Sequence, residues 1–233
     1  MRSAILILAL ALTPLTASPG AAEEQTLFKF LRLETDYADW GAAEREITWD
    51  GEGWIGGDTE KIWLKTEGEW TDGELEDAEF QLLYSRNIAA FWDAQIGIRH
   101  DLRPDPANYL ALALNGLAPY FFESDLSAFL SDEGDVSARA DLSYDFLITQ
   151  RLIAEPYLEA NFYAQDVPEL EVGAGLSDID AGLRVRYEIE REFAPYIDLN
   201  YTGLVGETHN IAQASGRDPD NFALRIGLRF WLN

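Results

Sequence analysis

The sequence predicts an all-β fold: a closed antiparallel transmembrane up-and-down β-barrel of about 12 strands. Three observations favour it. Apolar and polar residues alternate with a period of two along most of the chain. The connections between these segments are alternately short and long. The last segment ends on a pattern typical of barrels that are inserted into membranes.

Composition narrows the function classes before any motif is considered. The 233 residues include 42 Asp and Glu against 17 Lys and Arg, a net charge of −25 that repels nucleic-acid phosphates. The absence of cysteine excludes disulfide scaffolds and thiolate sites. A mean hydropathy of −0.17 excludes a bundle of membrane helices, but not a barrel, because barrel strands are only half apolar.

Residues 1–22 have the features of a secretory signal peptide. Met1-Arg2 gives a positive start, residues 4–12 are an apolar run, and residues 20–22 are small. The apolar run is far shorter than the roughly 20 residues that a membrane-spanning helix needs. We therefore expect cleavage before Glu23, with residues 23–233 forming the barrel; a buried core helix is the weaker alternative.

Alternation is clearest in residues 135–150. Every even position from Val136 to Ile148 is apolar, and every odd position from Asp135 to Asp145 is Asp, Ser or Arg. A period of two is typical of a strand with one apolar and one polar face. The same pattern predicts twelve strands near 28–37, 45–57, 59–71, 74–85, 88–101, 107–116, 119–131, 135–149, 152–164, 177–190, 194–204 and 221–232. Most have the length of a tilted membrane strand, which makes a soluble sandwich the weaker alternative.

The connections support the same topology. With the N-terminus on the periplasmic side, alternate turns should be tight. The expected tight turns are 57–58, 85–87, 116–119, 149–151 and 191–193, and the longer opposite connections include 100–107, 165–176 and 206–220. The final pattern, Arg225-x-Gly227-x-x-Phe230-x-Leu232, resembles the C-terminal signal of outer-membrane barrels. Aromatic residues near strand ends, such as Trp54, Trp63 and Trp70, suit interfacial girdles, and ordinary packing is the alternative for each of them.

If the apolar face contacts lipid, the polar face lines the lumen. The acids expected in this lining include Glu67, Glu69, Asp77, Glu79, Asp141 and Asp145. One interpretation is a structural lining of salt bridges. The other is a cation path, because acids outnumber bases and carboxylate oxygens favour metal cations.

Candidate metal ligands are His100, Asp101, Glu123 and Asp125. Imidazole and carboxylate both suit Cu(II), and Glu123 and Asp125 lie one step apart on the same strand face. His100 falls on the lipid-facing side of the alternation, so an interfacial position remains open for it.

Enzymatic motifs are not found in the sequence. It contains no Gly-x-Ser-x-Gly elbow, glycine-rich phosphate loop or His-Glu-x-x-His pair. A lipase barrel needs a serine two positions after its histidine, and here Leu102 follows His100 and Ile211 follows His209. We therefore expect no enzyme.

Several stretches together resemble one family, the copper resistance protein B family of Gram-negative outer-membrane proteins. The matching stretches are Trp49-Asp50, Trp54-Ile55-Gly56-Gly57-Asp58, Trp63-Leu64-Lys65-Thr66-Glu67-Gly68-Glu69, Gly97-Ile98-Arg99-His100-Asp101, residues 116–123, 133–139 and 147–153, Arg186-Tyr187-Glu188-Ile189, residues 191–196 and Arg229-Phe230-Trp231. The resemblance implies copper binding as cargo and a role in copper resistance and homeostasis, by sequestration or export at the cell outer membrane. The implied partners are outer-membrane lipid, copper ions and a periplasmic copper-handling protein.

The family often has a segment rich in Met and His before the barrel. Here residues 23–27 lead straight into the first expected strand, and the only methionine is Met1. Because thioether sulfur suits Cu(I), we expect a site built from carboxylates and His100 that favours Cu(II), or dependence on a soluble partner. The alternative function is a structural or general diffusion barrel with a charged lumen and no copper preference.

Overall fold

The computed structural model describes residues 27–38 and 45–233, most of them in strands. The signal peptide expected at residues 1–22 lies outside the described residues. The strands are β1 (Phe28–Ala38), β2 (Glu46–Gly56), β3 (Glu60–Thr71), β4 (Glu74–Ala89), β5 (Trp92–Arg103), β6 (Ala107–Ala118), β7 (Phe122–Ser131), β8 (Val136–Ser143), β9 (Phe146–Leu147), β10 (Leu152–Tyr163), β11 (Gly175–Tyr187), β12 (Phe193–Leu204) and β13 (Asp220–Leu232).

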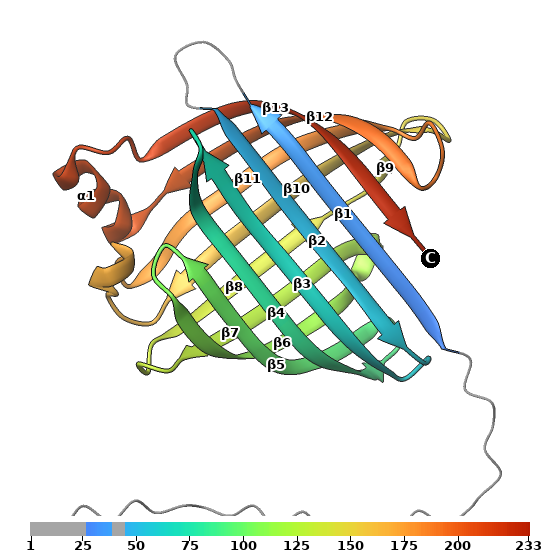
Figure 1. Ribbon diagram of the computed structural model, residues 1–233, viewed down its shortest axis with the longest axis horizontal. Coiled ribbons are helices and arrows are strands. Elements are labelled where there is room, and N and C mark those ends of the chain that lie inside the picture. Colours follow the sequence, from blue (N-terminus) through green and yellow to red (C-terminus); the bar gives the residue numbers. More distant parts are fainter. Residues whose placement is uncertain (1–26, 39–44) are drawn as a thin grey trace, which may run out of the picture.

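The strands close into an antiparallel barrel (Figure 1). Apart from β8 and β9, each strand pairs with the next along the chain, and β13 pairs with β1 from Leu31↔Leu232 to Tyr37↔Ile226. The short β9 and the longer β8 both pair with β10, so they share one position in the barrel wall. The predicted up-and-down barrel of about 12 strands is therefore confirmed.

The strand expected at 135–149 is interrupted at Tyr144 and Asp145, between β8 and β9. Opposite this interruption β10 contains Pro156, which has no amide hydrogen to donate to a neighbouring strand. The chain keeps one contact there, a hydrogen bond from the Tyr144 amide to the Pro156 carbonyl at 3.2 Å. Asp145 is thereby released from the regular ladder, and its side chain pairs with Arg186.

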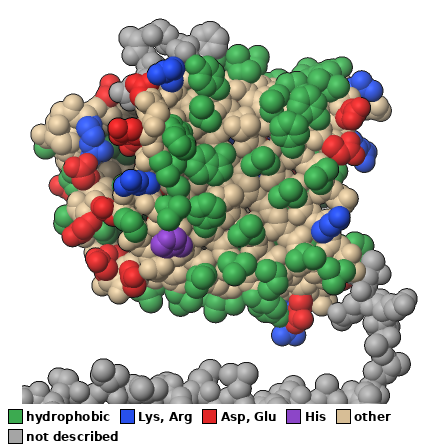
Figure 2. All heavy atoms as spheres, in the orientation of Figure 1, with side chains coloured by type: hydrophobic (Ala, Val, Ile, Leu, Met, Phe, Trp, Pro, Cys, Tyr) green, Lys and Arg blue, Asp and Glu red, His purple; other side chains and the backbone are tan. Residues whose placement is uncertain are grey.

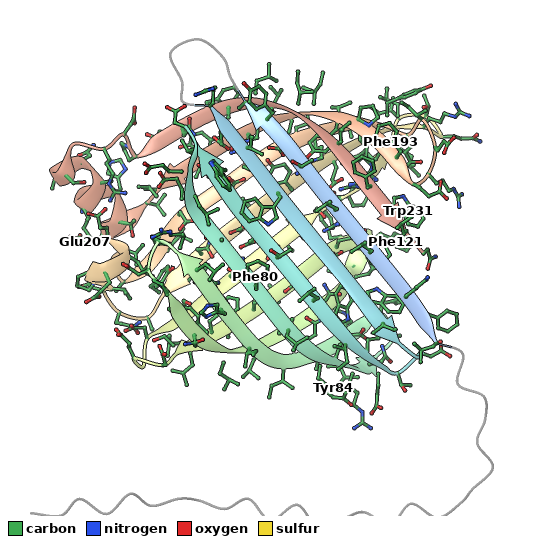
Figure 3. All side chains as sticks on the ribbon, viewed as in Figure 1. Phe80, Tyr84, Phe121, Phe193, Glu207 and Trp231 are labelled. Atoms are coloured by element: carbon green, nitrogen blue, oxygen red, sulfur yellow. The ribbon has the colours of Figure 1, made fainter. Side chains whose placement is uncertain are left out.

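The alternation predicted from the sequence sorts side chains to the two sides of the wall. On β4, Leu82 is 50% exposed on the outer face, whereas the next residue, Leu83, is fully buried inside. Phe80 and Tyr84 of the same strand also lie on the outer face (Figure 3). Figure 2 shows hydrophobic side chains over the middle of the outer surface and charges gathered toward its ends. An apolar belt with polar ends is what a lipid bilayer requires of a membrane barrel.

Within residues 27–38 and 45–233, no helix combines the length and the apolar character needed to cross a membrane.

The two ends of the barrel differ in the length of their connections, and we call them the short-turn end and the α1 end. The short-turn end has the C-terminus and the connections 57–59, 90–91, 119–121, 148–151 and 188–192. The α1 end has the long connections 164–174 and 205–219, and in Figure 1 it lies opposite the C-terminus. The prediction of a turn at 85–87 is wrong, because β4 continues to Ala89. Ser85 and Asn87 continue the polar side of this strand, and both donate hydrogen bonds to Asp93.

A helix that the alternation did not predict, α1 (Gly206–Ser215), lies in the connection before β13. It ends at Gly216, whose left-handed backbone (φ 80°) lets its amide reach the carbonyls of Ala212 and Gln213. Thr208 and Ala212, one helical turn apart, are buried, and Thr208 Oγ1 accepts a hydrogen bond from the Gly173 amide at 3.0 Å. The helix thus fastens the two long connections to each other at the α1 end.

Candidate functional site in the barrel lumen

A charged cavity of about 500 Å³ occupies the lumen. Side chains from nearly every strand line it, and most of them are Asp, Glu, Arg or Lys. The sequence-predicted acids that line this cavity are Glu67, Glu69, Asp77, Glu79, Glu123, Asp125 and Asp141. Asp145, Asp101 and His100 lie outside it, at other positions on the wall.

Arg139 on β8 crosses the lumen to the opposite side of the barrel. Its guanidinium pairs with Glu67 on β3, with Glu79 on β4 at 3.0 Å and with Glu159 on β10 at 3.5 Å. Glu79 is only 2% exposed and also contacts Arg99 at 2.8 Å. Charges buried this deeply need such partners, so this cluster fits the salt-bridge lining expected from the sequence.

A second ionic cluster is centred on Glu34, which was not among the acids expected in the lumen. Glu34 on β1 pairs with both Arg184 and Arg229, and Arg229 Nη2 continues to Glu155 Oε2 on β10 at 2.9 Å. The signal for Glu34 was present, because Arg32, Glu34 and Asp36 form the polar side of the alternation in β1. The glutamate pairs with arginines that are distant in sequence, so alternation could place it inside but could not name its partners.

Two tyrosines on the lumen face lie over glycines of the neighbouring strand. The Tyr157 ring covers Gly182, and its hydroxyl donates to Asp198 Oδ2 on β12 at 2.8 Å. The Arg184 guanidinium lies 5.4 Å from the centre of this ring and 4.8 Å from that of Tyr196. Aromatic faces thus stabilise an arginine that Glu34 also holds.

An apolar cluster fills one side of the lumen. Trp63, Leu83, Ala111 and Phe129 pack together with their side chains buried. Trp63, expected in an interfacial girdle, lies in this cluster and is only 7% exposed. The reason is its parity on β3, which it shares with the lumen-facing Lys61 and Lys65 rather than with the lipid-facing Ile62 and Leu64.

The structure does not bring the four candidate metal ligands together. His100 and Asp101 are consecutive residues near the α1 end of β5, and their side chains point to opposite faces. His100 Nδ1 contacts Asn108 Oδ1 at 2.9 Å, whereas Asp101 is buried inside and accepts two hydrogen bonds from Arg99, each 2.7 Å. Glu123 and Asp125 lie near the start of β7, at the short-turn end.

Glu123 and Asp125 share the lumen face of β7 but have different surroundings. Asp125 accepts hydrogen bonds from Lys65, from Asn115 Nδ2 at 3.1 Å and from Ser127 Oγ at 2.9 Å. In the described part of the chain, Glu123 forms no ion pair with a lysine or arginine, and the same holds for Glu69, Asp77 and Asp141. These carboxylates keep lone pairs available to a mobile cation.

No three His, Asp or Glu side chains within the described ranges converge as a metal site would require. A resident ion with a complete set of ligands therefore does not fit these side-chain positions.

Solved structures with the same fold include two porins. The NanC porin matches with a TM-score of 0.57 and 15% identity over 86% of this chain and 98% of its own. The KdgM porin matches with a TM-score of 0.52 and 10% identity over 88% of this chain and 99% of its own. At this identity the likeness shows the barrel fold alone.

Sequence comparisons identify the family. The protein-family model described as "Copper resistance protein B precursor (CopB)" matches residues 26–232. Copper resistance protein B of Escherichia coli is 42% identical over 215 residues, covering 91% of this chain and 72% of that protein. A copper resistance protein B homolog of Pseudomonas syringae pv. tomato is 38% identical over 201 residues, 86% of this chain and 67% of that protein. The resemblance and the outer-membrane location expected from the sequence are thus both confirmed, and this chain belongs to the copper resistance protein B family.

Proposed function

We propose that this barrel contributes to copper resistance by binding copper ions in its lumen and sequestering or exporting them at the outer membrane. The observation that carries the proposal is the set of cavity carboxylates without a basic partner among the described residues, in a chain whose relatives are named for copper resistance. The family and the porin-like barrel both fit a non-enzymatic role.

The donor atoms favour Cu(II) over Cu(I). Cu(II) accepts carboxylate oxygen and imidazole nitrogen, whereas Cu(I) prefers sulfur ligands. The sequence has no cysteine, and its one methionine is Met1. Glu123 and Asp125 are our leading ligands, because they share one face of β7 and both line the cavity. A periplasmic copper-handling protein would exchange ions with this pair from the short-turn end.

The test is Cu(II) titration of the refolded barrel, with Zn²⁺ as the competing metal. We expect the Glu123→Gln/Asp125→Asn variant to bind Cu(II) several-fold more weakly while remaining folded. The matched control is Glu60→Gln/Asp58→Asn, which removes one Glu and one Asp from exposed positions. Asp58 lies in the 57–59 turn, and Glu60 is the first residue of β3. Equal affinity of the wild type and the lumen variant would overturn the assignment of the ligands.

Loss of the gene tests the role in the cell. A deletion strain should grow more poorly on copper and contain a different amount of copper; unchanged tolerance and content would contradict the proposal. The porin fold favours one alternative, a general diffusion barrel, which would conduct ions in a bilayer without any preference for copper.

A further inference from the structure

Lys65 on β3 bridges the lumen to Asp125 on β7. Three strands lie between β3 and β7 in the order of the sheet, so this ion pair spans the interior and does not run along the wall. Asn115 and Ser127 also donate to Asp125, and together the three donors hold its carboxylate in place. The pair therefore places a fixed anion and a tethered cation across the lumen.

The pair lies where two cavities meet. The lumen cavity of about 500 Å³ and a second cavity of about 330 Å³ share Glu52, Asn115, Glu123 and Ser124. Asn115 lies directly opposite Asp125 across the β6–β7 ladder, and Glu52 lies directly opposite Lys65 across the β2–β3 ladder. Asp125 and Lys65 are thus the cross-strand partners of two of the shared residues, and their ion pair lies beside the junction.

Lys65 has fewer carboxylate partners than Arg139, which also crosses the lumen. Arg139 pairs with Glu67, Glu79 and Glu159, whereas the only carboxylate in ion-pair contact with Lys65, among the residues described, is Asp125. An ammonium group on a flexible stem is a compact point charge, and it lacks the rigid fork with which arginine binds several acids. Lys65 is therefore easier to release from its acid than Arg139.

A second position for the ammonium group lies beside the first. Directly opposite residues on one face of an antiparallel pair have Cβ atoms about 4.5–5.5 Å apart, which puts Glu52 within reach of the lysine stem. Glu52 contacts Arg32 at 3.4 Å and keeps room for a further donor, because a carboxylate has four lone-pair sites. Lys65 can thus exchange Asp125 across the lumen for Glu52 along the wall.

We propose that Lys65 is a tethered counter-cation that gates the passage of mobile cations through this barrel. At rest its ammonium group occupies Asp125 and closes the junction. A mobile cation that binds Asp125 and the neighbouring Glu123 displaces the ammonium group to Glu52 and opens the junction. The inference deepens the proposed function and rests on it only for the identity of the cargo.

The experiment uses the full barrel in planar lipid bilayers, with K⁺ as the probe in a KCl gradient. We expect Lys65→Gln to raise K⁺ conductance several-fold and to move the reversal potential toward that of a cation-selective pore. The matched control is Lys29→Gln, the same substitution at an exposed position on β1, which should conduct like the wild type. Wild-type conductance and selectivity in Lys65→Gln would overturn the proposal, as would the absence of current in both proteins.

Two further variants separate a gate from a merely structural contact. Lys65→Arg should conduct no more than the wild type, because a guanidinium forks onto Asp125 and stays there. Lys65→Gln/Asp125→Asn should conduct but lose the gain in cation selectivity, because the fixed anion is gone. Heat-modifiable migration on gels establishes that each variant is folded. A double variant as cation-selective as Lys65→Gln would contradict the role given to Asp125.

The outcomes distinguish this inference from the proposed function. If Cu(II) binding is the same with and without Glu123 and Asp125, while Lys65→Gln still opens the pore, the copper site fails and the gate stands. If Cu(II) binding depends on the two carboxylates, while Lys65→Gln conducts like the wild type, the gate alone is overturned.

Discussion

The hydroxyl of Tyr196 on β12 donates a hydrogen bond to Asp36 Oδ2 on β1 at 3.0 Å. The ring reaches Asp36 by passing over Gly227 of β13, where a Cβ atom would lie 2.2 Å from Tyr196 Cζ. Because β13 and β1 form the seam that closes the barrel, this bond crosses the seam from the inside. The glycine is therefore needed for a close approach between side chain and backbone.

We predict that Gly227→Ala destabilises the barrel by about 1–3 kcal/mol, the range for overpacking a filled site. The added methyl group must displace the Tyr196 ring and with it the hydrogen bond to Asp36. Urea unfolding of the refolded protein in lipid vesicles measures the change. Gly57→Ala is the control, because a Cβ there meets no atom within 4 Å. Identical unfolding midpoints for the two variants would contradict the prediction.

Alternation alone predicted most of the barrel, because lipid and lumen impose opposite demands on consecutive residues of every strand. It placed Glu67, Glu79 and Asp125 inside correctly. The error came from residue type and not from alternation: Trp63 was expected in a girdle because it is aromatic, but its parity points it inward, where it packs with Leu83 and Phe129.

Ion-pair partners could not be predicted from the sequence. Lys65 and Asp125 are 60 positions apart and Arg184 and Glu34 are 150 apart, so their contacts depend on the diameter and register of the closed barrel. The helix α1 was missed for another reason. It is short, it follows the β12 strand directly, and it has only one well-defined signal, the glycine that ends it.

An arginine on the lipid face tests the orientation of the wall. Leu112 lies in the middle of β6, 48% exposed, with its neighbour Ala113 buried on the lumen side. We predict that Leu112→Arg lowers the free energy of unfolding in vesicles by about 2–4 kcal/mol, the cost of a charge near the bilayer midplane. Leu112→Ala controls for lost packing and should cost clearly less. Equal costs for the two substitutions would argue against lipid contact at this position.

The contact between the two long connections is local and should be separable from the barrel. Thr208→Val keeps the shape of the buried side chain but removes the acceptor for the Gly173 amide. A hydrogen bond contributes about 0.5–1.5 kcal/mol, so exchange of the Gly173 amide should accelerate by up to about tenfold. Hydrogen–deuterium exchange with mass spectrometry measures it.

Thr149→Val is the matched control at the other end of the barrel. Its hydroxyl accepts hydrogen bonds from the Arg151 and Leu152 amides, so the change should accelerate exchange in that turn and leave Gly173 unaffected. If Thr208→Val leaves exchange at Gly173 unchanged, α1 does not hold the neighbouring connection.

The Arg139 crossing should be important for stability, in contrast to the gating role proposed for Lys65. Arg139→Gln leaves Glu67 and the buried Glu79 without their main shared partner. Breaking a buried pair costs about 3–5 kcal/mol, and we expect the lower part of that range because Glu79 keeps its contact with Arg99. Urea unfolding of the refolded barrel gives the value.

A second substitution shows whether the unpartnered acid causes that loss. Adding Glu67→Gln to Arg139→Gln should recover part of the stability, because Arg139 is the one cation that pairs with Glu67 among the described residues. Arg217→Gln is the control: its pair with Glu171 at 2.6 Å is about half exposed and should be worth about 0–1 kcal/mol. If the double variant is no more stable than Arg139→Gln, the loss comes from packing, and the ion pairs of this cluster are not what holds the two sides of the lumen together.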